Sequence, residues 1–184
     1  LFSELSFAKG ISGIQFVPRI STHQTYYGKN SNGETNAVRG LMTAGFDLST
    51  RFRRFYPMKT QFWGLELSGL RHILEPGLKY RYPPDPTLLS SHLPAFDAID
   101  ALTERNRLTF ILDNKFQTRR DFGESSSVVD LVDLVLESNY DFKTETEGKL
   151  IDLKGTLELR PSPFWGLIGD AKYDTERDEV TVAN

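Results

Sequence analysis

The chain has 184 residues, of which 39% are apolar, and its 22 Lys and Arg against 25 Asp and Glu give a formal net charge of −3. This length suits one domain or part of a larger one, and the nearly balanced charge, without a long basic run, argues against a nucleic-acid partner. The absence of cysteine excludes a disulfide framework, a Cys-based zinc site and a thiol nucleophile. No apolar run approaches the roughly 20 residues of a membrane helix, whereas barrel strands need only about 9–11 alternating residues.

Apolar and polar residues alternate in about nine segments, which predicts β-strands with two chemically different faces. In chain order the expected strands are Leu1–Phe7, Ile11–Tyr26, Ala37–Phe55, Leu70–Tyr82, Glu104–Arg119, Ser127–Lys143, Lys149–Arg160, Phe164–Asp174 and Val180 onward. Several exceed the roughly 5–6 residues of a typical globular strand, which favours the tilted strands of a membrane wall. Pro18 lies inside the second segment, where it requires a bulge or a sheet edge.

The connectors between these segments carry turn chemistry. Gly, Asn, Ser and Pro gather at Gly28–Gly33, Glu147–Gly148 and Pro161–Pro163. Connector lengths tend to alternate, and the longest is Pro83–Thr103, as expected if short turns lie on one side of a membrane and longer loops on the other. Within that long connector we expect a short helix at Ala98–Arg105.

The alternation is clearest at Ile151–Arg160, where odd positions are apolar or Gly and even positions are charged or Thr. In a soluble sandwich such an apolar face meets a second sheet, whereas in an outer-membrane barrel it meets lipid and the charged face lines a wet interior. We expect the barrel arrangement. The residues expected to face acyl chains are Leu153, Leu157 and Leu159, and those expected to face the interior are Asp152, Lys154 and Glu158.

Two longer segments alternate with one exception each. In Glu104–Arg119 the exception is Ile111, and in Ser127–Lys143 it is Asp130, which interrupts the apolar face near the start of the strand. The expected apolar sets are Leu108, Phe110, Leu112 and Phe116 in the first segment, and Val128, Val132, Leu134, Leu136, Tyr140 and Phe142 in the second.

The charged residues expected on the inner face mix both signs. They are Glu75, Lys79, Arg81, Asp113, Lys115, Arg119, Asp152, Lys154, Glu158 and Arg160. Such a set could line a hydrated lumen, contact a plug protein, or form the solvated outer face of a soluble sheet. The mixture argues against a pore with strong ion selectivity.

Aromatic residues gather near the expected strand ends, which is typical of the girdles at a membrane–water interface. The pairs are Tyr26 and Tyr27, Phe55 and Tyr56, Tyr80 and Tyr82, Tyr140 and Phe142, and Phe164 and Trp165. Ordinary β propensity predicts the same enrichment, so this pattern alone does not decide between a barrel and a soluble sheet.

No constellation of residues supports catalysis. His72 and Glu75 have the spacing of a helical metal pair, but on a strand an offset of three places them on opposite faces. Ser6–Lys9 fits S-x-x-K and Asp121–Gly123 spells D-F-G, yet the companion motifs of both enzyme classes are missing. We therefore expect a protein that is not an enzyme, with no catalytic residue, metal or cofactor.

The segment Leu70–Tyr82, LRHILEPGLKYRY, followed by LPAFDAID at Leu93–Asp100 and ERNRLTFILDNKFQTRR at Glu104–Arg120, resembles the barrel region of the LptD family of LPS-assembly proteins, also called OstA or organic solvent tolerance proteins. In that family an R-H-x-x-x-P strand leads to a Tyr-rich segment, a loop with F-D and a strand opening near R-N-R. The matching residues are Arg71, His72, Pro76, Tyr80, Tyr82, Phe96, Asp97, Arg105, Asn106 and Arg107. The resemblance covers about fifty residues directly.

The resemblance implies an antiparallel up-and-down transmembrane β-barrel in the outer membrane of a Gram-negative bacterium. Such a protein receives lipopolysaccharide from a periplasmic bridge of Lpt components and releases it into the outer leaflet, in contact with outer-membrane lipid. It also implies a plug lipoprotein of the LptE type and a periplasmic jelly-roll domain. No jelly-roll portion is seen, the family's common cysteines are absent, and nine strands are too few for the whole barrel. We therefore expect residues 1–184 to form a single partial barrel domain, a fragment of a longer chain.

Pro76 and Gly77 have a structural meaning of their own. Proline removes a ladder donor, so Pro76 should mark a bulge or a local break, and Gly77 permits close approach of the backbone. Two other functions remain open at this point. A porin-like solute channel would need a constriction with biased charge, and a soluble β-sandwich or lipocalin-like binding module would pack its apolar face into a core.

Overall fold

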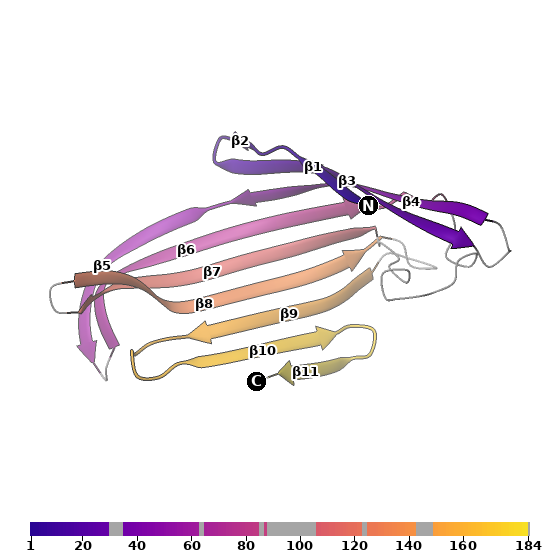
Figure 1. Cartoon of the computed structure of the whole chain (residues 1–184). Helices are drawn as coiled ribbons and strands as arrows, with labels where there is room; N and C mark the ends of the chain where they lie inside the picture. The colour runs from indigo at the N-terminus through magenta and orange to yellow at the C-terminus, as the bar shows by residue number, and fades with distance from the viewer. Residues whose placement is uncertain are drawn as a thin grey trace.

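The structure, a computed structural model, describes residues 1–29, 35–62, 65–84, 87, 106–122, 125–142 and 149–183. These residues form one antiparallel sheet of eleven strands (Figure 1). The strands are β1 (Phe2–Ser6), β2 (Lys9–Ile11), β3 (Ile14–Lys29), β4 (Thr35–Thr50), β5 (Phe52–Phe62), β6 (Leu65–Tyr82), β7 (Arg107–Phe122), β8 (Ser125–Asp141), β9 (Lys149–Leu159), β10 (Leu167–Asp174) and β11 (Glu179–Ala183).

The strands follow one another through the sheet in chain order, which is an up-and-down topology. The order is β1-β3-β4-β6-β7-β8-β9-β10-β11, with β2 pairing β3 and β5 pairing β6. Figure 1 shows a curved sheet that does not close, with β1 and β2 at one edge and β11 at the other. The predicted fold class, an incomplete antiparallel up-and-down sheet, is confirmed.

Pro18 explains why β1 and β2 are separate strands. The register is the same on both sides of the gap, since Ser6 lies opposite Arg19 and Lys9 lies opposite Phe16. Pro18 falls within the gap and has no N–H to donate to the outer neighbour, so the ladder is interrupted there without a bulge. The break faces the edge of the sheet, which is where a proline in a strand is tolerated.

Pro76 separates β4 from β5 in the same way. Ser49 lies opposite Gly77 and Phe52 lies opposite Leu74, so the register continues unchanged across the gap. On its other side Pro76 pairs with Leu112 of β7 without any shift. The predicted local break is therefore present, and it takes the form of missing hydrogen bonds on one side. Because β1/β2 and β4/β5 each continue one line, the sheet has nine strand positions, as expected from the alternation.

Connector lengths alternate between the two ends of the sheet. At one end the strands are joined across residues 12–13, 63–64, 123–124 and 160–166, and at the other across 30–34, 83–106, 142–148 and 175–178. The 12–13 turn has φ of 49° and 85° at Ser12 and Gly13, as a two-residue type I′ hairpin requires. The helix expected at Ala98–Arg105 lies outside the described residues.

Several expected boundaries are wrong by three residues or more; the largest difference is the end of β5, which is Phe62 and not Phe55. β6 begins at Leu65, five residues earlier than expected, because alternation resumes there. β7 begins at Arg107, three residues after the expected start at Glu104. β10 begins at Leu167 and not at Phe164, because Pro161 and Pro163 withhold two donors and the chain continues as a turn up to Gly166.

Bulges shift the phase of β6, β8 and, at Ile151 between Leu150 and Asp152, β9. Gly69, with φ of 81°, is the extra residue between Ser68 and Leu70 on β6, and glycine adopts this conformation without strain. On β8 the extra residue is Leu131, which falls between Val132 and Asp130 where they pair with Phe116 and Gln117 of β7.

The Leu131 bulge accounts for the irregularity predicted at Asp130. Because the phase slips by one residue, Asp130 shares the polar face with its partner Gln117. Val128, expected on the apolar face, pairs with Arg119 and lies on the polar face, so that expectation was wrong. Val129 takes its place on the apolar face, opposite Thr118.

Burial in this sheet is the reverse of burial in a soluble domain. Among the described residues, Leu131 is the one buried large apolar side chain, at 7% exposure. The buried polar side chains are Arg39, Thr43, Thr118, Arg120, Asn139, Asp141, Asp152 and Ser162. Large apolar side chains such as Phe110 and Val180 are 50% and 66% exposed. Of the buried polar side chains, Arg39, Thr43, Asn139, Asp141 and Asp152 share one face, so the sheet has a packed polar side, whereas its apolar side is largely uncovered.

Candidate functional site

The register assigns the expected leucines to one continuous apolar face. Leu134 of β8 lies opposite Leu157 of β9, and the row continues to Gly169 of β10. One residue further along, Asp133 lies opposite Glu158 and belongs to the other face. The predicted sorting onto two faces is confirmed for residues 152–159, because directly opposed residues share a face.

The polar face is held by ion pairs that cross from strand to strand. Near the first strands, Arg19 of β3 contacts Asp47 of β4 at 2.8 Å and Glu4 of β1 at 2.7 Å. Asp47 also accepts an ion pair at 2.7 Å from Arg81 of β6. Gly45 makes this possible, because a Cβ there would lie 2.2 Å from the Tyr80 carbonyl oxygen and 3.0 Å from Arg81 Cδ. One carboxylate thus links three strands.

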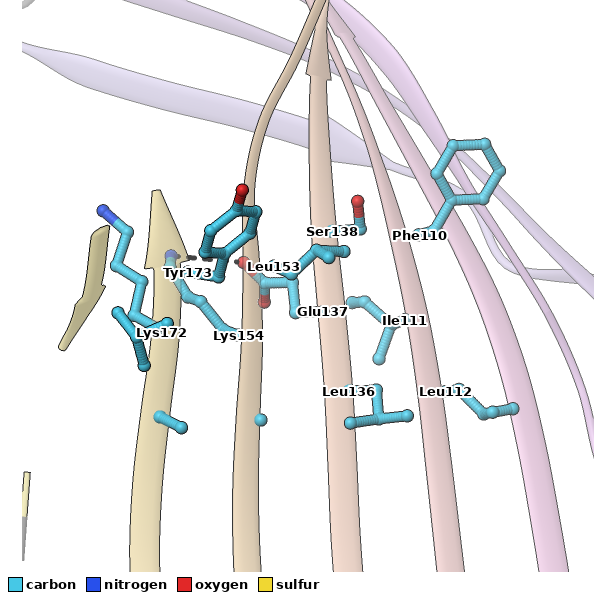
Figure 2. A pocket seen from close by; sticks show the side chains of 13 residues that line it. Phe110, Ile111, Leu112, Leu136, Glu137, Ser138, Leu153, Lys154, Lys172 and Tyr173 are labelled. Carbon is cyan, nitrogen blue, oxygen red and sulfur yellow. Dashed lines mark ion pairs between the residues drawn. The ribbon is translucent and has the colours of Figure 1, made fainter. Parts of the chain in front are cut away.

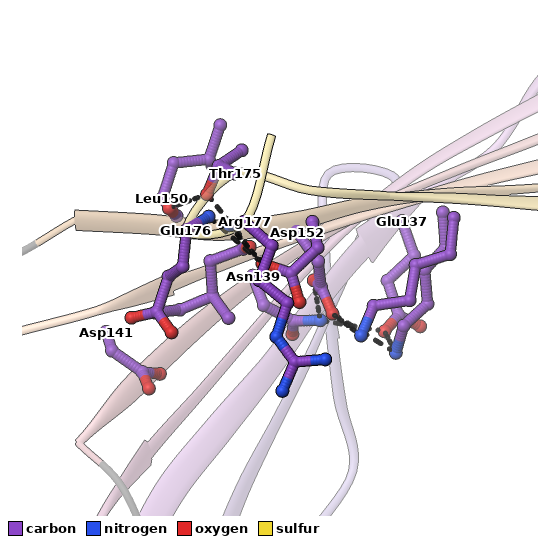
Figure 3. Close-up of polar contacts among 12 residues, drawn as sticks. Glu137, Asn139, Asp141, Leu150, Asp152, Thr175, Glu176 and Arg177 are labelled. Atoms are coloured by element: carbon purple, nitrogen blue, oxygen red, sulfur yellow. Dashed lines mark hydrogen bonds and ion pairs between the residues drawn. The ribbon is translucent and has the colours of Figure 1, made fainter. Parts of the chain in front are cut away.

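A second polar group joins β7, β8, β9 and β10, and Figure 3 shows its members Asp141, Asn139, Glu137 and Asp152. Arg107 holds Asp141 through two hydrogen bonds, from Nε at 2.7 Å and from Nη2 at 3.2 Å, and Asp141 is 1% exposed. Beside this pair, Asn139 receives a hydrogen bond from Thr109 at 2.7 Å and donates one to Asp152 at 2.7 Å. These side chains satisfy one another, which offsets the cost of burying them.

Two lysines complete this group on β9 and β10. Lys154 lies 3.5 Å from Glu137 and 3.6 Å from Asp152, and Lys172 lies 3.7 Å from Asp152. The side chains of Lys154 and Lys172 are each 45% exposed, so both ammonium groups are hydrated while they neutralise the carboxylates. The arrangement is typical of a hydrated surface with paired charges, and not of a pore lined by charges of one sign.

Further along β7 and β8 the polar face continues as a third group. Lys115 contacts Asp133 at 2.9 Å and lies 3.9 Å from Asp130. Gln117 donates to Asp130 at 2.6 Å and accepts a hydrogen bond from Arg71 Nε at 2.8 Å. The polar face therefore carries paired charges over most of its length.

His72 lies on the apolar face, opposite to the face that carries Glu75, as the strand offset predicts. Its ring stacks on Phe116 with centroids 4.3 Å apart and planes 5° apart. Its Nε2 lies 2.7 Å from Asn114 Oδ1. Because this polar pair satisfies itself, it can sit on an otherwise apolar surface. In the part of the chain that the structure describes, no group of His, Asp and Glu is arranged to hold a metal ion.

A hollow of about 390 Å³ lies on the apolar face between β7 and β10 (Figure 2). Phe110, Leu153 and Tyr173 border it, and Gly155 and Ala171 lie between them where larger side chains would fill the space. The small residues thus create an apolar depression in an exposed surface.

The family-motif residues fall into two groups about ten residues apart along β6. Arg107 holds Asp141, Asn106 accepts a backbone hydrogen bond from Phe142 N at 2.9 Å, and the Tyr80 ring lies 6.0 Å from that of Phe142. Tyr82 ends β6 beside them and is 46% exposed.

The other motif residues lie elsewhere or are not described. Arg71 and His72 lie further down β6 on opposite faces, and Pro76 lies between the groups at the break in the ladder. Phe96, Asp97 and Arg105 lie outside the described residues.

The linking roles of Arg19 and Asp47 were not foreseen from the sequence. Alternation alone places Asp47 on the polar face, since it lies between Phe46 and Leu48. Its partners Arg19 and Arg81 lie 28 and 34 residues away in the chain, and only the register brings the three together.

Within the described residues, no helix is long and apolar enough to cross a membrane. Long antiparallel strands in chain order, with an exposed apolar face and a packed charged face, define the wall of a β-barrel of the outer-membrane type.

The chain belongs to the LptD family, because the family model described as LPS transport system D matches residues 3–184. The resemblance inferred from the β6–β7 region is confirmed and extends over nearly the whole chain. A search of curated proteins finds no match. By its description, the family serves the transport of LPS.

Proposed function

We propose that this chain forms part of an outer-membrane barrel wall that takes part in transporting LPS and inserting it into the outer leaflet. The observation that carries the proposal is the inverted burial: a packed polar face with Asp141 at 1% and Asn139 at 3% exposure, and an apolar face left open. In water an uncovered apolar surface of this extent is unfavourable, whereas in a bilayer it is covered by lipid.

The height of the apolar face fits a membrane. From Leu70 to Tyr82 the strand β6 extends about 40 Å, at roughly 3.3 Å per residue. A tilt of about 35–45° reduces this to roughly 30 Å across the bilayer, comparable to the band of about 25 Å in outer-membrane barrels. The end of the sheet where Phe62 pairs with Leu65 and Phe122 pairs with Ser125 would then face the periplasm, and the end with the longer connectors would face the cell exterior.

The two alternatives are less well supported. A soluble sandwich needs a second sheet over the apolar face, and the described strands form a single sheet. A porin-like channel needs biased charge, but cations and carboxylates are paired along most of the polar face, as for Arg19 with Asp47 and Lys115 with Asp133.

We further propose, from family membership, that residues 1–184 are one partial barrel domain. Its polar face would contact a plug lipoprotein of the LptE type, and a jelly-roll domain and the periplasmic Lpt bridge would deliver LPS. For the motif residues we propose structural roles: Arg107 fixes β7 to β8 through Asp141, and Pro76 frees one side of β6 from β5. None of these roles requires a chemical reaction, so the proposed function is not enzymatic.

The function can be tested in a Gram-negative host in which the full-length protein is expressed from a regulated promoter. Pulse-labelled LPS accessible at the cell surface is measured before and after depletion. We expect surface LPS to fall while an unrelated barrel protein still reaches the outer membrane. Normal arrival of newly made LPS in depleted cells would overturn the proposal.

A further inference from the structure

Four cations gather on the polar face at the short-turn end of β5, β6 and β7. Lys59 and Arg119 lie on either side of Ser68, and one row further along the sheet Arg71 lies opposite Phe55. Arg53 lies opposite Ile73 in the next row. We name the set of Arg53, Lys59, Arg71 and Arg119 the basic rim.

The basic rim brings together cations that lack counter-charges among the described side chains. Within the described ranges, none of its four members makes an ion pair, although cations elsewhere such as Arg19, Arg107 and Lys115 each contact a carboxylate. All four rim residues are exposed.

One acidic neighbour of the rim with a described side chain, Asp130, is already engaged. Asp130 accepts a hydrogen bond from Gln117 at 2.6 Å and lies 3.9 Å from Lys115, outside the rim. Arg71 donates to the neutral side-chain oxygen of the same Gln117. Among the described side chains, none therefore neutralises the positive charge of the rim.

Phe55 adds an apolar surface in the middle of the basic rim. Its side chain is 65% exposed, and its ring covers the space above Gly69, where a Cβ would lie 2.7 Å from the Phe55 Cζ. An exposed ring among cations suits a ligand that carries both anionic groups and an apolar or sugar surface.

The spacing of the rim sets the size of that ligand. Strands lie about 4.8 Å apart and same-face neighbours about 6.8 Å apart along a strand, so the rim covers an area about 10 Å wide and about 15 Å long. Guanidinium groups bind phosphate through paired hydrogen bonds. Several phosphates on one sugar headgroup can span such an area, whereas a single inorganic phosphate cannot contact all four cations.

We propose that the basic rim binds the phosphate groups of a phosphorylated glycolipid headgroup at the periplasmic mouth of the barrel. This inference rests on the proposed function, which supplies the orientation of the sheet and the presence of LPS. It adds the place and the chemistry of substrate binding. The cations of β5, β6 and β7 around Phe55 bind the anionic part of the substrate as it enters the barrel.

The first test uses full-length protein purified from outer membranes together with its bound partners. Arg53→Gln and Arg119→Gln are made singly and together, and the matched control is Arg54→Gln, which removes the same charge one residue along β5 on the apolar face. Binding of LPS, of dephosphorylated LPS and of inorganic phosphate is measured at increasing salt. We expect about a tenfold loss of LPS affinity, which is about 1.4 kcal/mol, for each rim substitution, because each removes a charge-assisted hydrogen bond to phosphate.

The expected pattern also includes little effect of Arg54→Gln, weak binding of dephosphorylated LPS and of inorganic phosphate, and affinity that falls with salt. Equal affinities of the rim variants and the wild type would overturn the proposal. Equal binding of dephosphorylated LPS would do so too, and binding of inorganic phosphate as tight as that of LPS would assign the rim to a free anion instead.

The second test places a photo-crosslinking amino acid at Phe55 or, as control, at Tyr56 on the apolar face, in cells that produce LPS. We expect a crosslink to LPS at position 55 that decreases in the Arg53→Gln, Arg119→Gln background. A crosslink from position 55 to a protein alone would overturn the glycolipid assignment. If surface LPS still depends on the protein but neither test detects binding at the rim, the rim proposal fails and the proposed function stands. Independence of surface LPS from the protein removes both.

Discussion

The Thr118 hydroxyl donates a hydrogen bond of 2.7 Å to the carbonyl oxygen of Gly69. Thr118 is 3% exposed, and its oxygen also accepts a hydrogen bond from the backbone N–H of Ser68 at 3.1 Å. One side chain therefore satisfies two backbone groups that the Gly69 bulge removes from the ladder.

Replacement of Thr118 by Val should destabilise the barrel, because the Gly69 carbonyl and the Ser68 N–H lose their partner without a change of shape. We expect a loss of about 1–3 kcal/mol in the free energy of unfolding. Urea unfolding of the full-length protein in lipid vesicles measures it. Thr156→Val, at an exposed position of β9, serves as control and should change stability little; an equal loss in both variants would contradict the role of Thr118.

Arginine introduced at Leu134 or Leu157 should disturb insertion, since both side chains are proposed to face lipid. We expect a cost of about 2–4 kcal/mol for each if they lie near the middle of the bilayer. The unfolding free energy in vesicles and the amount of protein in the outer membrane are the measurements. Thr156→Arg, next to Leu157 on the polar face, should be tolerated, and unchanged stability of the leucine variants would refute the membrane face.

The Arg107–Asp141 pair should behave as a unit. Asp141→Asn removes the charged partner of the Arg107 guanidinium. Arg107→Gln removes the guanidinium that binds the Asp141 carboxylate, which is 1% exposed. Each variant should therefore lose about 1–3 kcal/mol in the free energy of unfolding. The double variant should lose less than the sum of the two. A double-mutant cycle in the full chain measures the coupling. Strict additivity would mean that the pair does not fix β7 to β8.

On the apolar face, removal of one member of the His72–Asn114 pair should cost more stability than replacement of both by apolar residues. Asn114→Leu leaves the His72 ring nitrogen unsatisfied and should destabilise by about 1–3 kcal/mol, whereas His72→Leu together with Asn114→Leu should be close to neutral. The comparison of unfolding free energies in vesicles decides it. If the double variant is worse than the single one, the two side chains have a role beyond satisfying each other.

The sequence predicts the strands and their faces well because the period of two is a local property. Leu157 and Glu158 are assigned to opposite faces by neighbours one residue away, and the register confirms this. The Leu131 bulge is different. Its extra residue becomes visible only once Phe116 and Gln117 of β7 are fixed as partners, so Val128 was placed on the wrong face. Asp130, which breaks the alternation, was the one local sign of that slip.

The candidate site was less predictable for the same reason. The expected inner charges on β7 and β9 follow from alternation, but which cation meets which carboxylate depends on strand neighbours. Arg107 and Asp141 are 34 residues apart, and nothing local joins them. Nor does alternation show that the charge of Arg53 lacks a partner while that of Arg51, two residues before it, is paired with Glu75.

Asp152 contacts Asn139 on one neighbouring strand, Lys172 on the other and Lys154 on its own. A carboxylate shared in this way should cause the residues that contact it to be replaced together during evolution. Where a related sequence replaces Asp152 by a neutral residue, Lys154 or Lys172 should be replaced as well, because either ammonium would otherwise lose its nearest counter-charge. Such linked replacements, rather than invariance at any one position, are the signature that natural variation should leave on this sheet.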